Sequence, residues 1–132
     1  MADSTLHAQQ SESNKNAASY VRKDFPDWAV TICFYAALHL IESYAANNGD
    51  DINRYGVPSD PPHTKRQAYV GQISNRIRNR ELRKAYDKLY DGSLMSRYMK
   101  DLDQSAVAYY QFAKNKVDGA FKDLAVVKAA LS

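Results

Sequence analysis

The stretch from Trp28 to Ile41 is almost entirely apolar, and it constrains the fold more than any other part of this chain. Twelve of its fourteen residues are apolar or aromatic, and only Thr31 and His39 interrupt them. On a helix these residues form two stripes on different sides, one of Trp28, Ile32, Tyr35 and His39 and the other of Val30, Phe34, Ala37 and Ile41. Because neither side is polar, both must be covered. The stretch therefore predicts a central helix.

Four large side chains of this helix are expected in the core or at a contact with a second copy of the chain: Trp28, Phe34, Tyr35 and Leu38. Helices of the same chain can cover one side, and a second copy is a plausible cover for the other in a domain of 132 residues. The pattern does not decide which face meets the partner. It predicts a homodimer.

The flanks of the apolar stretch also favour a helix. Asp24 is expected to cap the first turn, and Gly49 after two asparagines supplies a left-handed stop. A strand is the first alternative, because residues 30–35 include β-branched and aromatic side chains, but the alanines and leucines that follow favour helix. A membrane span is the second, but it needs roughly 18 to 20 apolar residues. Asp27 and Glu42 closely flank this shorter run, so we expect no membrane association.

Composition indicates one globular domain over residues 1–132, with residues 1–5 expected to be flexible. Hydrophobic residues make up 45% and charged residues 25%, which is ordinary for globular proteins. The single Cys33 excludes an internal disulfide, and the chain does not begin with a signal-peptide pattern. Both observations predict a cytoplasmic location.

Apolar spacing predicts an all-α, up-and-down bundle of four main helices, with an additional short helix before the long C-terminal one. A first helix covers 4–23, a loop covers 49–62, and Asp60 is expected to cap the helix that follows it. The apolar stripe slips after Ile77, which predicts a break near Asn79. Asp91 and Gly92 are expected to end that segment, and 93–98 to form a short turn. Residues 102–131 carry a regular seam, typical of one long helix.

Few residues suit catalysis. His63 and Arg66 lie one turn apart at a predicted helix start beside the long loop, where an imidazole can move protons and a guanidinium can hold a phosphate. A capping or surface role explains the same pair. His7, His39 and His63 could meet around a metal, but no helical ligand pair is present, so we expect no metal and no cofactor.

Two further groups are candidates for binding. Five cations crowd into nine positions and suit either a solvated helix face or a nucleic-acid surface: Arg76, Arg78, Arg80, Arg83 and Lys84. A polar pocket is expected around His39, Arg97 and Tyr98, although His39 also suits a core role. Arg97 is expected to pair with Asp101 or Asp103.

The block from Phe34 to Tyr44, FYAALHLIESY, with DWAV before it and a loop into HTKR after it, resembles the HEPN-type helical domains of prokaryotes. The segments from Tyr86 to Leu89 and from Ser96 to Tyr98 are similar to one branch of that group. The resemblance extends over roughly residues 6–130. It implies a helical up-and-down bundle, usually a dimer, of the kind found in toxin–antitoxin, phage-defence and CRISPR-linked proteins.

Active HEPN members are metal-independent ribonucleases whose signature is an arginine followed, after four to six residues, by a histidine. This chain lacks that spacing, since the nearest case, Arg54 to His63, has eight residues between. The resemblance therefore implies a non-catalytic or weakly catalytic dimeric binding or scaffold domain, associated with RNA or a nucleotide. One alternative is a ribonuclease that uses His63 and Arg66. Another is a bundle that binds only a partner protein, for example one of the same operon.

Overall fold

The computed structural model describes residues 3–132, and every regular element within them is a helix. The elements are α1 (Ser4–Val21), α2 (Pro26–Asn48), the short 3-10 helix η1 (Ile52–Arg54), α3 (Pro62–Arg76), α4 (Arg80–Tyr98), α5 (Ala106–Phe112) and α6 (Lys114–Ala130). Residues 1–2, part of the segment expected to be flexible, lie outside the described residues. The predicted all-α class is confirmed.

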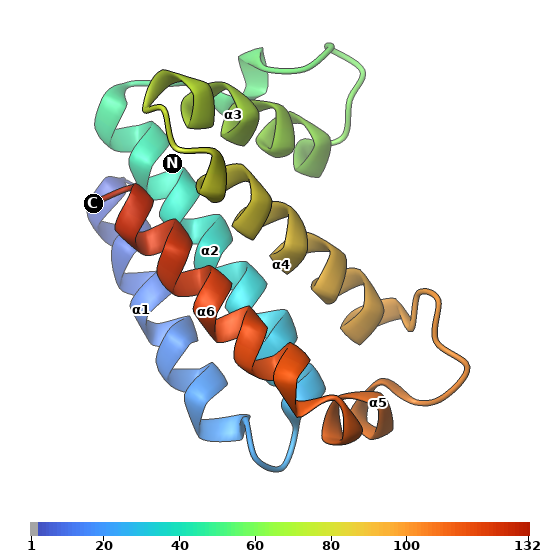
Figure 1. Cartoon of the computed structure of the whole chain (residues 1–132). Coiled ribbons are helices and arrows are strands. Elements are labelled where there is room, and N and C mark those ends of the chain that lie inside the picture. The colour runs from blue at the N-terminus through green and yellow to red at the C-terminus, as the bar shows by residue number, and fades with distance from the viewer. Residues whose placement is uncertain (1–2) are drawn as a thin grey trace.

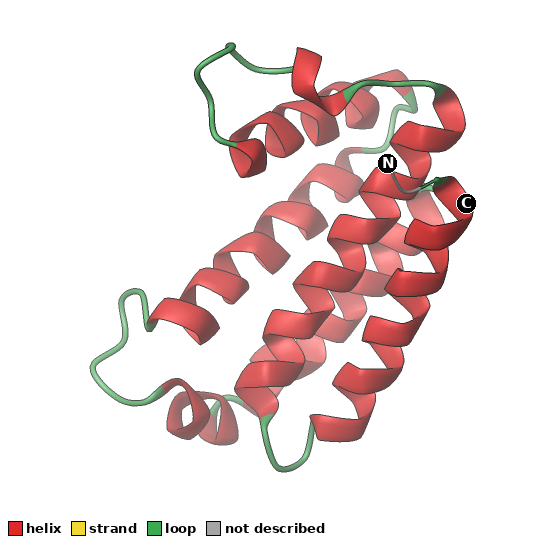
Figure 2. Cartoon of the chain, turned by 180° about the vertical axis from the view of Figure 1, so that it is seen from behind, coloured by secondary structure: helices red, strands yellow, loops and turns green. Residues whose placement is uncertain are grey.

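Helices α1, α2, α4 and α6 form an up-and-down bundle with α2 at its centre (Figures 1 and 2). Helix α2 contacts α1, α4 and α6, while α4 also contacts α6. Helix α3 lies across one end of the bundle, near both chain ends, and α5 lies at the opposite end. The buried serine of α1, Ser11, donates to the Ala36 carbonyl oxygen at 2.8 Å, so α1 is attached to α2 by a polar contact as well as by packing.

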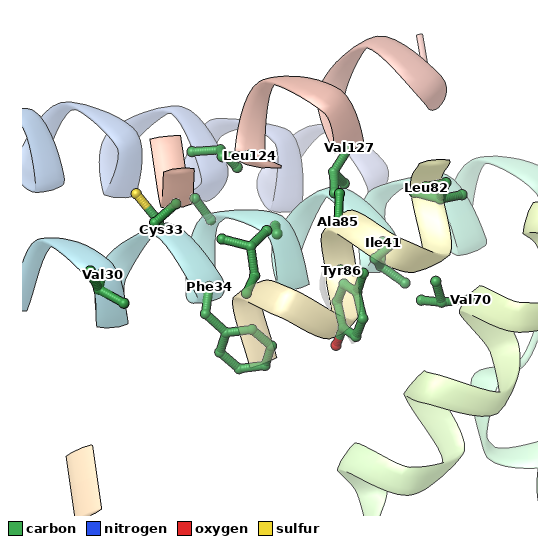
Figure 3. Packing of buried hydrophobic residues seen from close by; sticks show 14 of the residues in the cluster. Val30, Cys33, Phe34, Ile41, Val70, Leu82, Ala85, Tyr86, Leu124 and Val127 are labelled. Atoms are coloured by element: carbon green, nitrogen blue, oxygen red, sulfur yellow. The ribbon is translucent and has the colours of Figure 1, made fainter. Parts of the chain in front are cut away.

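One of the two apolar stripes of α2 makes the core. Phe34 and Ile41 are buried against Tyr86 of α4, and Val127 of α6 lies on the same cluster (Figure 3). Burial raises the pKa of the Cys33 thiol to about 12, so this residue is a neutral core side chain at physiological pH.

The other stripe is only partly covered by the chain itself, since Ile32 and His39 are half-buried. Trp28 is 57% exposed and Tyr35 36% exposed, whereas Phe34 is 3% exposed. Leu38 is half-buried and packs against the core. A core position for Trp28 and Tyr35 is therefore wrong, because α1 and α4 lie on either side of α2 and leave this strip of its surface open. Their contact with a second copy stays a prediction.

Helix α2 is long and apolar enough, by length and composition, to cross a membrane. Half of its most apolar window is buried within the bundle.

Of the three residues expected to cap or stop α2 and α3, two do not act as predicted. Helix α2 begins after Phe25 with Pro26 in its first position, and Asp24 does not cap it. Asp60 instead accepts a hydrogen bond from the Val57 backbone, so α3 begins after a proline without a side-chain cap. Gly49 does end α2, with a φ of 69° and its N–H bonded to carbonyls of the last turn.

The predicted break near Asn79 is confirmed and separates α3 from α4. The side-chain oxygen of Asn79 accepts hydrogen bonds from the backbone N–H of Glu81 at 3.1 Å and of Leu82 at 3.3 Å. Arg78 before it has a φ of 55°, in the left-handed region. The chain therefore reverses here through one strained residue and one strong N-cap.

The predicted end at Gly92 is wrong, because α4 continues through 93–98 to Tyr98. A Cβ at Gly92 would lie 3.3 Å from Val30, so glycine permits close packing of α4 on α2 and does not end the helix. The single long helix over 102–131 is also wrong. Ala113 has non-helical dihedral angles and separates α5 from α6, and the Ser105 hydroxyl caps α5.

We expect Asn79→Ala to lower the free energy of unfolding by about 1 kcal/mol, because it removes the only side chain that caps α4 in the described structure. Urea denaturation at neutral pH measures the change. Asn75→Ala, at an exposed position of α3, is the matched control and should leave the midpoint unchanged or raise it slightly. Equal effects of the two substitutions would contradict the capping role.

Candidate functional site

The partly covered face of α2 carries a regular line of five residues that we call the α2 stripe: Trp28, Ile32, Tyr35, His39 and Glu42. Steps of four and three residues place them on one helical face, over a rise of about 21 Å. The stripe changes character along its length. Its first half is aromatic, and its second half carries an imidazole and a carboxylate.

Arg97 of α4 lies against the aromatic half. Its guanidinium donates to the Tyr35 hydroxyl oxygen at 2.8 Å, to the Ser93 carbonyl oxygen at 3.2 Å and to the Ser93 hydroxyl oxygen at 3.1 Å. The guanidinium carbon lies 4.9 Å from the ring centre of Tyr98 and 5.5 Å from that of Tyr35. A planar cation held by hydrogen bonds and ring faces is fixed in orientation before any ligand arrives.

The hydrogen-bond partners of Arg97 are all neutral. The expected ion pair with Asp101 or Asp103 is wrong: within residues 3–132 no carboxylate lies within 4.0 Å of this guanidinium. Helix α4 ends at Met99 in a left-handed turn, and both aspartates follow that turn in an exposed loop. Arg97 therefore presents a positive charge that no described side chain neutralises. Of the expected polar pocket, Arg97 and Tyr98 lie together, and His39 lies one turn beyond Tyr35.

At the polar half, two histidines from different helices meet. The Nδ1 atoms of His7 and His39 lie 2.9 Å apart, so one ring donates a hydrogen and the other accepts it. Burial, and then the nearby His7, lower the pKa of His39; Glu42 raises it and Arg66 lowers it to a smaller extent. The third histidine does not join them. Within the described residues no group of three or more metal-binding side chains is present.

Glu42 and Arg66 close the polar half. The Arg66 guanidinium donates to the Glu42 carboxylate at 3.1 Å, and both side chains are largely buried. Together with His7 they line a recess of about 730 Å³ at the end of α2, next to η1 and the start of α3. The pair therefore anchors α3 to α2 and also forms part of a wall accessible to a ligand.

His63 and Arg66, the candidate acid–base pair, contact different partners. The His63 ring stacks on Tyr90 of α4, with centroids 5.6 Å apart and planes 17° apart. Tyr90 in turn contacts Phe34 under the stripe at 5.6 Å. Arg66 points instead to Glu42. An exposed, stacked imidazole and an ion-paired guanidinium on the same helical turn do not by themselves form a catalytic pair.

Three of the five cations between 76 and 84 are held by carboxylates. Arg76 contacts Asp50 at 2.7 Å, Arg83 contacts Asp87 at 3.8 Å, and Lys84 contacts Glu81 at 3.7 Å. Hydrogen bonds from Arg76 and from the Tyr69 hydroxyl lower the pKa of Asp50, so that carboxylate stays charged. Arg78 and Arg80 lie exposed at the turn between α3 and α4. Arg76 is therefore a structural tie between the end of α3 and the loop after α2.

The contacts around the α2 stripe were not found by sequence analysis. Their only sequence signal is the spacing of Tyr35, His39 and Glu42 on one face of a helix already predicted. Their partners, His7, Arg66 and Arg97, are distant in sequence and are brought to this face by the fold.

Comparison with known protein families, with curated proteins and with solved structures found no match to this chain.

We expect the contribution of His39 to the free energy of unfolding to be fully present above about pH 6.5. As the pH decreases below that value, the free energy of unfolding should decrease. The folded-state pKa of His39 lies below its ordinary value, so protonation favours the unfolded chain as the pH decreases. His39→Gln should flatten this part of the stability–pH curve, measured by urea denaturation between pH 5 and 8.

Ser43→Ala is the matched control for that experiment, because it removes a 2.9 Å hydrogen bond to the Ser4 carbonyl oxygen between the same two helices but no titrating group. It should lower stability by a similar amount at every pH in the range. A slope in His39→Gln equal to that of the unaltered chain would contradict the assignment.

Proposed function

We propose that this chain is an HEPN-like helical binding module that holds single-stranded RNA beside Tyr35 of the α2 stripe, against Arg97 and Tyr98 of α4. The observation that carries the proposal is Arg97, a guanidinium fixed by neutral partners between Tyr35 and Tyr98. RNA phosphates are anions, and unpaired bases stack on aromatic rings and on guanidinium planes. Tyr98 is 66% exposed and so offers an accessible ring beside that charge.

The mild formal charge of +3 is consistent with a local site more than with a broad electrostatic surface. Most of the basic segment 76–84 is already bound to carboxylates, and those pairs would have to be broken or shared for a phosphate to gain much there. Arg97 needs no such exchange. The contrast supports the Arg97 surface over the basic segment as the main phosphate contact.

We expect Arg97→Gln to raise the Kd for a single-stranded RNA about tenfold at low salt, equivalent to about 1.4 kcal/mol. The salt dependence of log Kd should also become shallower, because one phosphate contact is lost. Fluorescence anisotropy over a salt series measures both quantities. Arg80→Gln, at an exposed arginine without an ion pair in the described structure, is the matched control and should change the affinity little.

The outcomes of this experiment separate the possible surfaces. A loss with Arg80→Gln equal to that with Arg97→Gln would move the contact to 76–84, and no binding by the unaltered chain would remove the proposal. The same samples test the ribonuclease alternative on a gel without metal. Cutting that disappears in His63→Ala would support acid–base chemistry there, and intact RNA at saturating protein would remove it.

We further propose that the Trp28 end of the stripe contacts a second copy of the chain. Phe25 and Trp28 are 54% and 57% exposed, one helical turn apart, and exposed aromatic pairs of this kind are enriched at interfaces between proteins. A partner protein of another sequence is the remaining candidate for the same surface.

We expect Trp28→Arg to shift the chain toward the monomer in sedimentation velocity, because a charge would be buried at the contact. Tyr20→Arg is the matched control, since Tyr20 is 91% exposed on α1 and lies outside the stripe. A monomeric unaltered chain at high micromolar concentration would contradict the dimer. So would a dimer unchanged by Trp28→Arg.

A further inference from the structure

On the face of α4 turned toward α6, a cleft of about 520 Å³ opens between α4, α5 and α6. We call it the α4–α6 cleft. Its volume lies within the range of small-molecule sites in proteins. None of the residues proposed above to bind RNA or a second copy lines this cleft. A ligand in the cleft would therefore occupy a different site from the α2 stripe.

The floor of the α4–α6 cleft is apolar and aromatic. Val30, Leu89 and Tyr110 are buried beneath it, and the Tyr109 ring, which is half-buried, meets Tyr110 edge-to-face with centroids 5.0 Å apart. The Tyr110 hydroxyl is held on the Gly92 carbonyl oxygen at 3.4 Å. This lining suits the hydrocarbon or aromatic body of a ligand.

A glycine keeps the α6 wall open. Gly119 lies in the interior of α6, where glycine costs about 1 kcal/mol relative to alanine. A Cβ built at Gly119 would meet nothing within 4 Å, so packing within the described chain does not require glycine at this position. The absent side chain leaves room in the cleft. Gly92, on the opposite wall, has a different reason, because it lets α4 approach Val30.

The rim of the cleft carries a small excess of positive charge. Lys88, Lys116 and Lys122 line it together with Asp91 and Asp123. No ion pair within residues 3–132 involves any of these three lysines at 4.0 Å or less. Burial raises the pKa of Asp123 and the nearby Lys88 and Lys122 lower it, which indicates that the inner rim is partly shielded from water. Three cations against two carboxylates match a ligand with one negative charge.

We propose that the α4–α6 cleft binds a small amphiphilic monoanion, with an aliphatic or aromatic body on the Tyr109 floor and a carboxylate or sulfonate at the lysine rim. A cation of the same shape lacks the charge complement, and an inorganic anion lacks the apolar body. Both halves of the ligand are therefore required.

The test uses octanoate and naphthalene sulfonate as probes. Octylammonium, which carries the opposite charge on a similar chain, and inorganic phosphate, which lacks an apolar body, are the controls. Isothermal titration calorimetry of the full chain at low salt should show binding of the two amphiphilic anions and neither control. Gly119→Leu should abolish binding, because its side chain occupies the cleft, without lowering the melting temperature. Lys122→Glu should raise the Kd about fivefold. Lys15→Glu, on α1 and outside the cleft, makes the same change in net charge and should have no effect.

The proposal is overturned if neither anion binds below millimolar concentration, or if octylammonium binds as well as octanoate. It is also overturned if a folded Gly119→Leu chain binds as before, or if Lys15→Glu weakens binding as much as Lys122→Glu. Should Gly119→Leu fail to fold, Lys122→Glu against Lys15→Glu decides alone. The Kd for RNA of each variant should stay unchanged, because neither Gly119 nor Lys122 belongs to the α2 stripe. This measurement separates the cleft from the RNA site.

Discussion

Burial of α2 on three sides is the constraint from which the other features follow. Its Phe34 and Ile41 side packs against α4 and α6, and small residues such as Ala36 let α1 approach closely. A helix surrounded by three others still has a fourth side. In this chain the first half of that side is aromatic and exposed at Trp28 and Tyr35, and the second half is polar and partly covered by His7 and Arg66. The candidate site is thus the face of α2 that core packing does not use. Its exposed aromatic side chains can be buried only by a binding partner.

Charge pairing then distinguishes the cations of this small basic protein. Arg66 and Arg76 are bound to carboxylates and attach α3 to the end of α2. Within residues 3–132, Arg97 is bound only to hydroxyls, a carbonyl and ring faces. An arginine with an ion pair contributes chiefly to the architecture, whereas one held by neutral groups keeps its charge for a ligand. That difference is a stronger guide to a phosphate site here than the number of cations in a segment.

Local signals in the sequence predicted the local features, and they failed where distant contacts decide. The apolar run of α2, its stop at Gly49 and the break at Asn79 depend on neighbouring residues and were predicted correctly. Gly92 was interpreted as a helix end because the contact that explains it is not visible in the local sequence. That contact is the close packing of α4 on Val30, which is distant in the chain. The regular seam over 102–131 could not reveal the interruption at Ala113, since apolar spacing continues across it.

The candidate site shows the same division. Residue types and one helical face could be predicted, but the pairing of His7 with His39, of Arg66 with Glu42 and of Arg97 with Tyr35 joins residues 24 to 62 positions apart. No pattern of spacing within one helix contains that information.

The two ion pairs of α3 have a mechanical consequence. Arg66 lies near the beginning of that helix and contacts Glu42 of α2, and Arg76 lies at its end and contacts Asp50 in the loop after α2. Helix α3 is therefore held across one end of the bundle at two points (Figure 1). Tyr69, Val70 and Ile73 of α3 are also buried in the core, so these ion pairs act together with apolar packing. Hydrogen bonds from Arg76 and Tyr69 lower the pKa of Asp50, so the contact at the end of α3 persists at a pH at which an ordinary aspartate would already be protonated.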